Sequence, residues 1–213
     1  MRKEIYYSKK NATQKIAEWE EVCKEIKRRK PFEFSLNNAA LLVIDMQNIF
    51  LSQDSHAFIP SSPYIILNIH MLMEKFASKN RPILFSRHIM DASPGNLMNE
   101  WWSDLIRLED KKSEITEDLD TSLGKIIVKH QYSAFHGSEL DATLRKKGVS
   151  QVVITGVLTH LCCESTAREA FMRGYQVFFP FDATATYNEI LHLGAIRSIA
   201  HGFGICVSTK NLL

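Results

Sequence analysis

The chain has 213 residues, 45% of them apolar, and its 26 Lys and Arg almost balance its 24 Asp and Glu. This length and composition fit one domain, spanning residues 1–213, with a substantial buried core. Because the charges nearly balance, the chain lacks the strong net positive charge that is typical of nucleic-acid-binding proteins, so we expect no nucleic-acid partner. No apolar run is long enough to cross a bilayer and no signal-peptide segment is present, which predicts a cytoplasmic protein with no membrane partner.

The first 30 residues carry an excess of positive charge, with ten Lys or Arg against five Glu. We interpret this stretch as an N-terminal helical extension, at about residues 1–30, with a solvated charged face. Its other face is expected to pack on its own domain or on a second subunit, and binding to an anionic surface is the alternative. Four cysteines are too few for a disulfide scaffold in a chain of this length, so we expect free thiols.

Short apolar runs alternate with helical patterns along the rest of the chain. The runs are continuous, which is typical of strands covered on both faces. The pattern predicts an α/β fold with a six-stranded, mostly parallel sheet and helices on both faces. Strands are expected at residues 39–45, 81–88, 125–129, 151–156, 175–182 and 204–208, and helices at residues 64–80, 138–148, 161–174 and 189–202.

Glycines mark the expected ends of three helices, at Gly148, Gly174 and Gly202. The segment from Asp91 to Gly124 breaks the alternation, with two adjacent tryptophans and a charged stretch. We interpret it as a long excursion over the sheet edge or over the ligand pocket, where it can serve as a lid.

Three reactive side chains fall at the carboxyl ends of predicted strands, which is where ligands bind in open parallel sheets. Asp45 ends the first strand, Lys129 ends the third, and Cys162 follows the fourth at the start of a helix. The helix N-terminus and a nearby ammonium group favour a thiolate. Asp45 can then accept the thiol proton and pass it to a leaving group, while Lys129 orients the carboxylate and offsets negative charge.

Each of these residues also has a structural interpretation. An Asp at a strand end is often a turn former, a Lys after a strand usually faces solvent, and a buried Cys often serves only in packing. Their shared position at the ends of strands favours the functional interpretation. In addition, the turn before Cys162 can present backbone amides to an oxyanion.

Three ordered motifs resemble those of the isochorismatase-like superfamily of cysteine hydrolases. They are "ALLVIDMQNIF" with Asp45, "VKHQYSAFHGSEL" with Lys129, and "VVITGVLTHLCCESTAREAFMRGYQV" with Cys162, the last followed by "DATAT". The resemblance runs from about residue 39 to residue 207. It implies a Rossmann-like, three-layer α/β/α fold, an Asp–Lys–Cys triad, and a homodimer or homotetramer.

The resemblance also implies a cis peptide between Val157 and Leu158, which would direct the amides of Leu158 and Cys162 at the oxyanion. The family pattern assigns the nucleophile to Cys162 and places Cys163 in the core. Metal-using nicotinamidases of the superfamily carry an Asp-x-His set after the second strand.

In this chain His88 and Met90 stand at the two positions of that set, so we expect no metal and no other cofactor. A metal held by His160 with the two cysteines lacks a recognised ligand spacing.

We therefore predict a cysteine hydrolase that cleaves a C–N bond of a small amide, ureido or carbamoyl substrate through a thioester intermediate. The small-molecule substrate is expected to contact Phe50, Arg87, Tyr132, His160 and one of the tryptophans Trp101 and Trp102. Arg87 suits a substrate carboxylate or a structural ion pair equally well. His160 also has a structural interpretation, as a histidine whose hydrogen bonds are satisfied within the fold.

Two alternatives remain open. Siderophore-type isochorismatases share "YSAFH" and a histidine at the place of His160, although they tend to carry glycine in place of the cysteine. The first alternative is therefore hydrolysis of an enol ether, with Asp45 as general acid and Cys162 as a bystander. The second alternative is a catalytically silent protein that acts through protein contacts.

Overall fold

The structure is a computed structural model that describes residues 2–26, 32–90, 97–102 and 106–213. Its centre is a parallel sheet with the strand order β3-β2-β1-β4-β5-β7. These strands are β1 (Ala39–Ile44), β2 (Ile83–His88), β3 (Lys125–Lys129), β4 (Gln151–Val157), β5 (Gln176–Pro180) and β7 (Ile205–Val207). The predicted α/β fold with six main parallel strands is confirmed. A seventh strand, β6 (Thr184–Ala185), is only two residues long and pairs with the end of β4.

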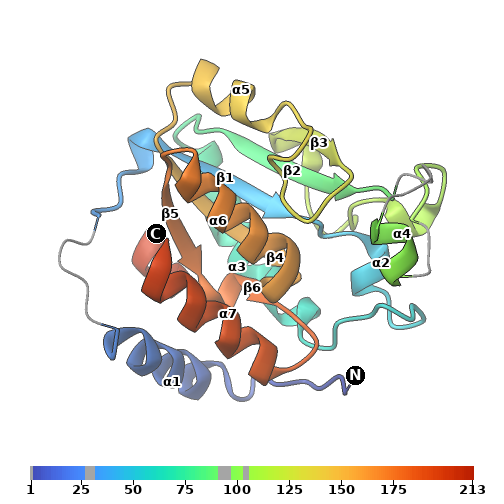
Figure 1. Cartoon of the computed structure of the whole chain (residues 1–213). Helices are drawn as coiled ribbons and strands as arrows, with labels where there is room; N and C mark the ends of the chain where they lie inside the picture. Colours follow the sequence, from blue (N-terminus) through green and yellow to red (C-terminus); the bar gives the residue numbers. More distant parts are fainter. Residues whose placement is uncertain (1, 27–31, 91–96, 103–105) are drawn as a thin grey trace.

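Helices cover both faces of this sheet (Figure 1). One face carries α3 (Ser62–Ala77), and the other carries α5 (Leu140–Lys146), α6 (Glu164–Met172) and α7 (Glu189–Gly202). The short helices α2 (Asn48–Leu51) and α4 (Leu97–Trp102) lie beyond the carboxyl ends of the strands. The layers explain the apolar runs of β1 and β4, whose residues are all buried, because a strand between two layers of helices has no face toward water. The expectation is wrong for β3, the edge strand, in which Ile126 and Val128 are exposed.

The packing of β1 and α3 illustrates how the sequence specifies these layers. All six residues of β1 are buried, as their uninterrupted apolar pattern predicts. In α3 the buried side chains recur at helical spacing, which forms one apolar stripe against the sheet. Each large side chain buried in this way contributes about 1.5–3 kcal/mol. The buried apolar residues of the stripe are Ile65, Ile69, Leu72, Met73 and Phe76.

The excursion after β2 is only partly described, since residues 91–96 and 103–105 lie outside the described ranges. Its described part contains α4 and two 3-10 turns, at Lys111–Ser113 and Thr121–Leu123. The gap between α4 and Ile106 leaves part of the predicted lid outside the described residues. Two smaller turns, at Leu36–Asn38 and Phe181–Ala183, flank the sheet, and Thr209–Leu212 follows β7.

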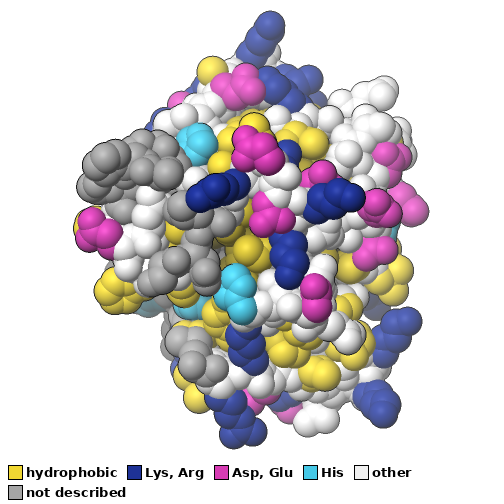
Figure 2. Space-filling model, turned by 90° about the vertical axis from the view of Figure 1, so that its right-hand side faces the viewer, with side chains coloured by type: hydrophobic (Ala, Val, Ile, Leu, Met, Phe, Trp, Pro, Cys, Tyr) yellow, Lys and Arg dark blue, Asp and Glu magenta, His cyan; other side chains and the backbone are white. Residues whose placement is uncertain are grey.

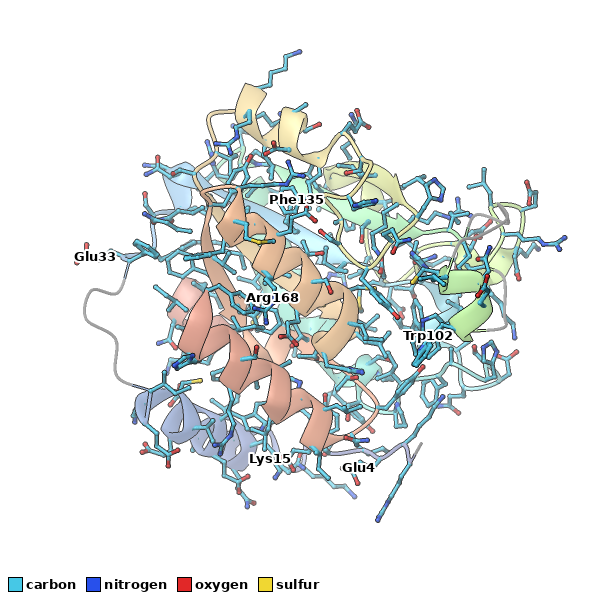
Figure 3. All side chains as sticks on the ribbon, viewed as in Figure 1. Glu4, Lys15, Glu33, Trp102, Phe135 and Arg168 are labelled. Atoms are coloured by element: carbon cyan, nitrogen blue, oxygen red, sulfur yellow. The ribbon has the colours of Figure 1, made fainter. Side chains whose placement is uncertain are left out.

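The basic N-terminal extension contains α1 (Ala12–Lys24), which lies beside α7 (Figure 1). Its Trp19 side chain is buried, and the indole Nε1 donates a hydrogen bond to Glu189 Oε1 at 3.1 Å. Lys15 lies between the two helices and forms an ion pair with the same Glu189 (Figure 3). The extension therefore packs on its own chain. Residues 27–30 of the predicted extension lie outside the described ranges. No helix within the described ranges is long and apolar enough to span a membrane.

Candidate active site

The carboxyl ends of three strands bring Asp45, Lys129 and Cys162 together. Asp45 directly follows β1, Lys129 is the last residue of β3, and Cys162 lies in the π-helical turn Thr159–Cys163 between β4 and α6. The Lys129 ammonium lies 2.8 Å from Asp45 Oδ2 and 3.4 Å from Cys162 Sγ. All three side chains are buried, so the cluster of Asp45, Lys129 and Cys162 is withheld from bulk water.

Asp45 is held in an unusual backbone conformation by β2. Its φ angle of 48° lies in the left-handed region, which costs a non-glycine residue about 1–3 kcal/mol and is found most often at functional sites. The hydroxyl of Ser86 donates to Asp45 Oδ1 at 2.6 Å and accepts from the Asp45 amide at 3.1 Å. Ser86 thus orients both the carboxylate and the backbone that carries it.

Gln47 ties the end of β1 to its neighbours. Its side-chain oxygen accepts from the amide of His88 at 2.7 Å, and its side-chain nitrogen donates to the carbonyls of His88 and Ser113, at 2.9 and 2.7 Å. Because Gln47 is completely buried, these bonds form without competition from water. They fix the strand ends that carry the cluster relative to the excursion.

The electrostatics indicate that Cys162 rests as a thiol. Burial is the largest influence and raises the pKa of the Cys162 thiol to about 12, with a further increase from Asp45 and a partial decrease from Lys129. For Lys129, burial lowers the pKa, but the interactions with the Asp45 carboxylate and with Cys162 outweigh it and raise the pKa above the ordinary value. The expected thiolate is therefore not the resting form, and the proton must leave Sγ during the attack.

The turn that carries Cys162 begins at a cis peptide between Val157 and Leu158, as the family resemblance implies. The carbonyl of Leu158 accepts hydrogen bonds from the amides of Leu161 and Cys163, at 3.1 and 3.2 Å. This geometry widens the first turn around Cys162 into a π-helix. Cys163 is fully buried, and its Sγ lies 3.8 Å from the carbonyl of Thr155, in the core.

Gly156 is required just before this turn. Its φ is +105°, and a Cβ atom placed there would meet the backbone carbonyl of Ile44, the residue before Asp45. We expect Gly156→Ala to destabilise the fold by about 3 kcal/mol. We also expect it to lower kcat about a hundredfold, because it displaces the ends of both β1 and β4. Urea unfolding and steady-state kinetics measure the two effects.

Gly148→Ala is the matched control for this change. Gly148 also has a positive φ, of +64°, but a Cβ there meets no atom within 4 Å. It should cost about 1 kcal/mol of stability and leave kcat unchanged. Equal losses of activity in the two variants would contradict the role of the close contact between Gly156 and the backbone of Ile44.

A cavity of about 160 Å³ opens beside the cluster. It lies at the carboxyl edge of the sheet, and Figure 2, which views the molecule from this side, shows apolar side chains between charged ones. Two imidazoles and one thiol line it, from His56, His88 and Cys162. The remaining lining is apolar or aromatic and consists of Ile49, Phe50, Ala57, Met90, Met98, Trp102, Ile106, Tyr132, Leu158, Leu161 and Tyr187.

The predicted substrate contacts divide into two groups. Phe50, Tyr132 and Trp102 line the cavity, and the Trp102 indole donates a hydrogen bond to the Tyr132 hydroxyl at 2.9 Å. Figure 3 shows Trp102 on α4, at the sheet edge. Trp101 instead is 77% exposed.

Arg87 and His160 are not among the described residues that line the cavity. The Arg87 guanidinium donates to the carbonyls of Ser113 and Leu108, at 2.9 and 2.7 Å. His160 Nδ1 lies 2.7 Å from Thr186 Oγ1. Arg87 is thus held by backbone carbonyls, and His160 is hydrogen-bonded within the fold, as its structural interpretation expects.

His88 is a polar group of the cavity whose role the sequence did not reveal. Its Nδ1 lies 3.4 Å from the Lys129 ammonium. Burial, followed by the charge of Lys129, lowers the pKa of His88 to about 4, so the ring is neutral at pH 7. Because an ammonium group only donates, Nδ1 is the acceptor of this contact and the ring proton resides on Nε2.

The donor set does not fit a bound metal ion. By the family resemblance, His88 and Met90 stand at the positions of the Asp-x-His set, and in the structure His88 directs one nitrogen to Lys129. Within the described ranges, no group of three or more His, Cys, Asp or Glu is placed to hold a metal ion.

Ser86 and Gln47 were missed by sequence reasoning, although each carries a signal. Ser86 is a lone hydroxyl in a buried strand, and Gln47 is a fully buried amide two residues after Asp45. A polar side chain within an apolar run must find a partner, and here the partners are the strand ends that form the site.

The amino-acid sequence is similar to a known family model and to proteins of known name. The isochorismatase domain model matches residues 39–211. Nicotinamidase 3 of Arabidopsis thaliana is 38% identical over 179 residues, which cover 82% of this chain and 86% of that protein. Enterobactin synthase component B of Escherichia coli (strain K12) is 32% identical over 183 residues, covering 84% of this chain but only 64% of that protein.

Solved structures share the fold. A cysteine hydrolase from Pseudomonas syringae pv. phaseolicola 1448A superposes with a TM-score of 0.82 at 25% identity, over 87% of this chain and 96% of that chain. N-carbamoylsarcosine amidase from Thermoplasma acidophilum superposes with a TM-score of 0.72 at 24% identity, over 81% of this chain and 97% of that chain.

Proposed function

The chain belongs to the isochorismatase family of hydrolases, and within this family we propose that it cleaves the C–N bond of a small uncharged amide through attack by Cys162. One observation carries the proposal. The Lys129 ammonium lies 2.8 Å from the Asp45 carboxylate and 3.4 Å from Cys162 Sγ, and Cys162 lines an apolar cavity. An acid–base group and a nucleophile thus share one cation at the wall of a substrate-sized space.

The first half of the proposed reaction forms a thioester. Cys162 Sγ bonds to the amide carbon while its proton passes to Asp45. The C–N bond then breaks as Asp45 returns the proton to the departing nitrogen. Lys129 stays protonated throughout, because the charges beside it raise its pKa, and it offsets the negative charge of whichever partner is ionised.

The second half releases the acid. Water attacks the thioester carbon and gives a proton to Asp45, the C–S bond breaks, and the sulfur regains the proton. In both halves negative charge develops on the carbonyl oxygen. We assign its stabilisation to the backbone amides of Leu158, which directly precedes the π-helical turn, and of Cys162, which lies within it.

The cavity favours an uncharged substrate over isochorismate. Isochorismate carries two carboxylates, and a buried carboxylate needs a cation or several donors. None of the described lining residues is Lys or Arg, and Arg87 is engaged by backbone carbonyls elsewhere. A flat amide matches the aromatic walls, and its acyl group can accept a hydrogen bond from His88 Nε2.

A substrate panel tests the proposal directly. It contains nicotinamide, pyrazinamide, N-carbamoylsarcosine, ureidoacrylate and isochorismate, and it is read by ammonia release and product chromatography. We expect turnover of at least one carboxamide, together with an acyl adduct on Cys162 in mass spectra of acid-quenched enzyme. Turnover of isochorismate alone, with no adduct, would reject the covalent mechanism in favour of enol-ether hydrolysis.

His88 should orient the substrate through its Nε2 proton. We expect His88→Met, which removes the donor, to lower kcat/KM about tenfold, as the loss of one hydrogen bond to the substrate implies. His88→Gln retains a donor near the same place and should recover most of that loss. Steady-state kinetics of the two variants on the same amide measure the difference, and equal losses would assign His88 a packing role instead.

A further inference from the structure

An N-terminal arm, defined as residues 2–7, crosses two loops that wall the cavity. The first is the loop between α2 and α3. Lys3 Nζ donates to the carbonyl of His56, and the amides of Tyr6 and Tyr7 both donate to Ser61 Oγ at 3.2 Å. Tyr6 and Tyr7 are buried, so this end of the arm is anchored in the core.

The second loop connects β6 to α7 and carries Tyr187. The Glu4 amide donates to the carbonyl of Tyr187 at 2.9 Å, and the Glu4 carboxylate accepts from the amide of Glu189 at 3.1 Å. The Lys3 ammonium lies 4.5 Å from the centre of the Tyr187 ring, in a cation–π contact. Figure 3 shows Glu4 beside the start of α7, where these bonds form.

Both loops contribute to the cavity wall, since His56 and Tyr187 line the cavity beside Cys162. Lys3 joins them with one side chain, because it binds the His56 carbonyl and the Tyr187 ring together. The arm therefore touches the outside of the wall at the residues whose inner sides face the substrate space.

Tyr6 extends the same support to the turn that carries Cys162. Its hydroxyl accepts a hydrogen bond from the Thr186 amide at 2.9 Å and lies near the side chain of Thr159, the first residue of the π-helical turn. The Tyr6 ring packs 5.2 Å from the ring of His192 in α7. One arm side chain thus reaches both the Tyr187 loop and the Cys162 turn.

We propose that the N-terminal arm is a clamp that holds Tyr187 and the His56 loop in place and so limits the size of molecule that reaches Cys162. Lys3 and Tyr6 are positioning residues in this proposal, because they act through Tyr187, the His56 loop and Thr159. The consequence for substrate choice rests on the proposed hydrolase function, but the size limit itself is a property of the cavity.

The reaction of Cys162 with alkylating probes of two sizes tests the clamp without any substrate. Iodoacetamide and N-benzyl iodoacetamide are compared, and peptide mass spectrometry gives the alkylation rate at Cys162 itself. The ratio of the two rates cancels the thiolate fraction of the folded protein. Alkylation of Cys163, which is fully buried in the core, reports any reaction through the unfolded protein, and that contribution is subtracted. The variants are Lys3→Met, Tyr6→Phe, their combination, and Lys10→Met as a control from the same basic segment with an exposed side chain.

We expect the unmodified protein and Lys10→Met to favour the small probe strongly, and the combined variant to reduce that preference about tenfold. A preference that stays at the original value in the combined variant would overturn the clamp. The ratio of kcat/KM for a small and an N-benzyl-substituted amide should shift in parallel. If no amide is hydrolysed, the proposed function fails, while the alkylation ratio still decides the role of the arm.

Discussion

Cys162→Ala should lower kcat for the amide by about ten-thousandfold or more, with the fold intact. The nucleophile of a covalent hydrolase contributes on this scale, because without it the remaining groups can only assist a slow attack by water. Cys162 is buried but lines the cavity, so the missing sulfur leaves space at an existing opening and costs little packing. Steady-state kinetics and thermal unfolding measure the two quantities.

Cys163→Ala provides the matched control, since it removes the same sulfur one residue later. Cys163 is fully buried, with its Sγ 3.8 Å from the Thr155 carbonyl. We expect about 1 kcal/mol of destabilisation and nearly normal kcat. If Cys162→Ala kept substantial activity, the thioester route would be rejected and enol-ether hydrolysis would become the leading hypothesis.

Lys129→Met should damage both stability and activity. The ammonium is the cation that neutralises Asp45, and its removal leaves a buried carboxylate with uncharged partners such as the Ser86 hydroxyl. Breaking a buried ion pair from one side costs about 3–5 kcal/mol. Activity should fall at least about a thousandfold, because the proton exchange between Asp45 and Cys162 loses its balancing charge. Denaturant unfolding and kinetics at fixed pH measure these effects.

The double variant Asp45→Asn/Lys129→Met separates the two effects. It removes both charges, so at least half of the lost unfolding free energy should return while activity stays absent. Lys125→Met, at the exposed start of the same strand, removes only a surface ion pair with Glu139. It should change stability by less than about 1 kcal/mol. If Lys129→Met were as stable as the unmodified protein, the expectation that it leaves an uncompensated buried charge would be wrong.

Much of the fold could be predicted from the sequence because short apolar runs that alternate with helical patterns are typical of strands between two layers of helices. The ends of those strands then brought Asp45, Lys129 and Cys162 to one edge, and the structure places them within reach of one another. Their catalytic roles remain predictions. The path of residues 91–124 could not be predicted, because an irregular segment has no period that fixes its course.

The substrate contacts were harder to predict because they depend on side-chain direction. Successive residues of a strand point to opposite faces, so His88 and Ser86 share one side of β2 while Arg87 points to the other. The structure agrees, with Ser86 on Asp45, His88 on Lys129 and Arg87 on Ser113. Strict use of this alternation would have favoured His88 over Arg87. The hydrogen-bond partner of His160, in contrast, depends on the widened turn and could not be predicted from the sequence.

The apolar cavity bears on what happens after bond cleavage. Hydrolysis of a neutral amide yields a carboxylate, and the described wall beside Cys162 holds no Lys or Arg to retain an anion. The acid is therefore bound less well than the amide from which it came, since a carboxylate loses more hydration on entering an apolar space. In the proposed reaction, each turnover would therefore end with a product that the cavity binds poorly, and accumulated acid should compete weakly with fresh amide.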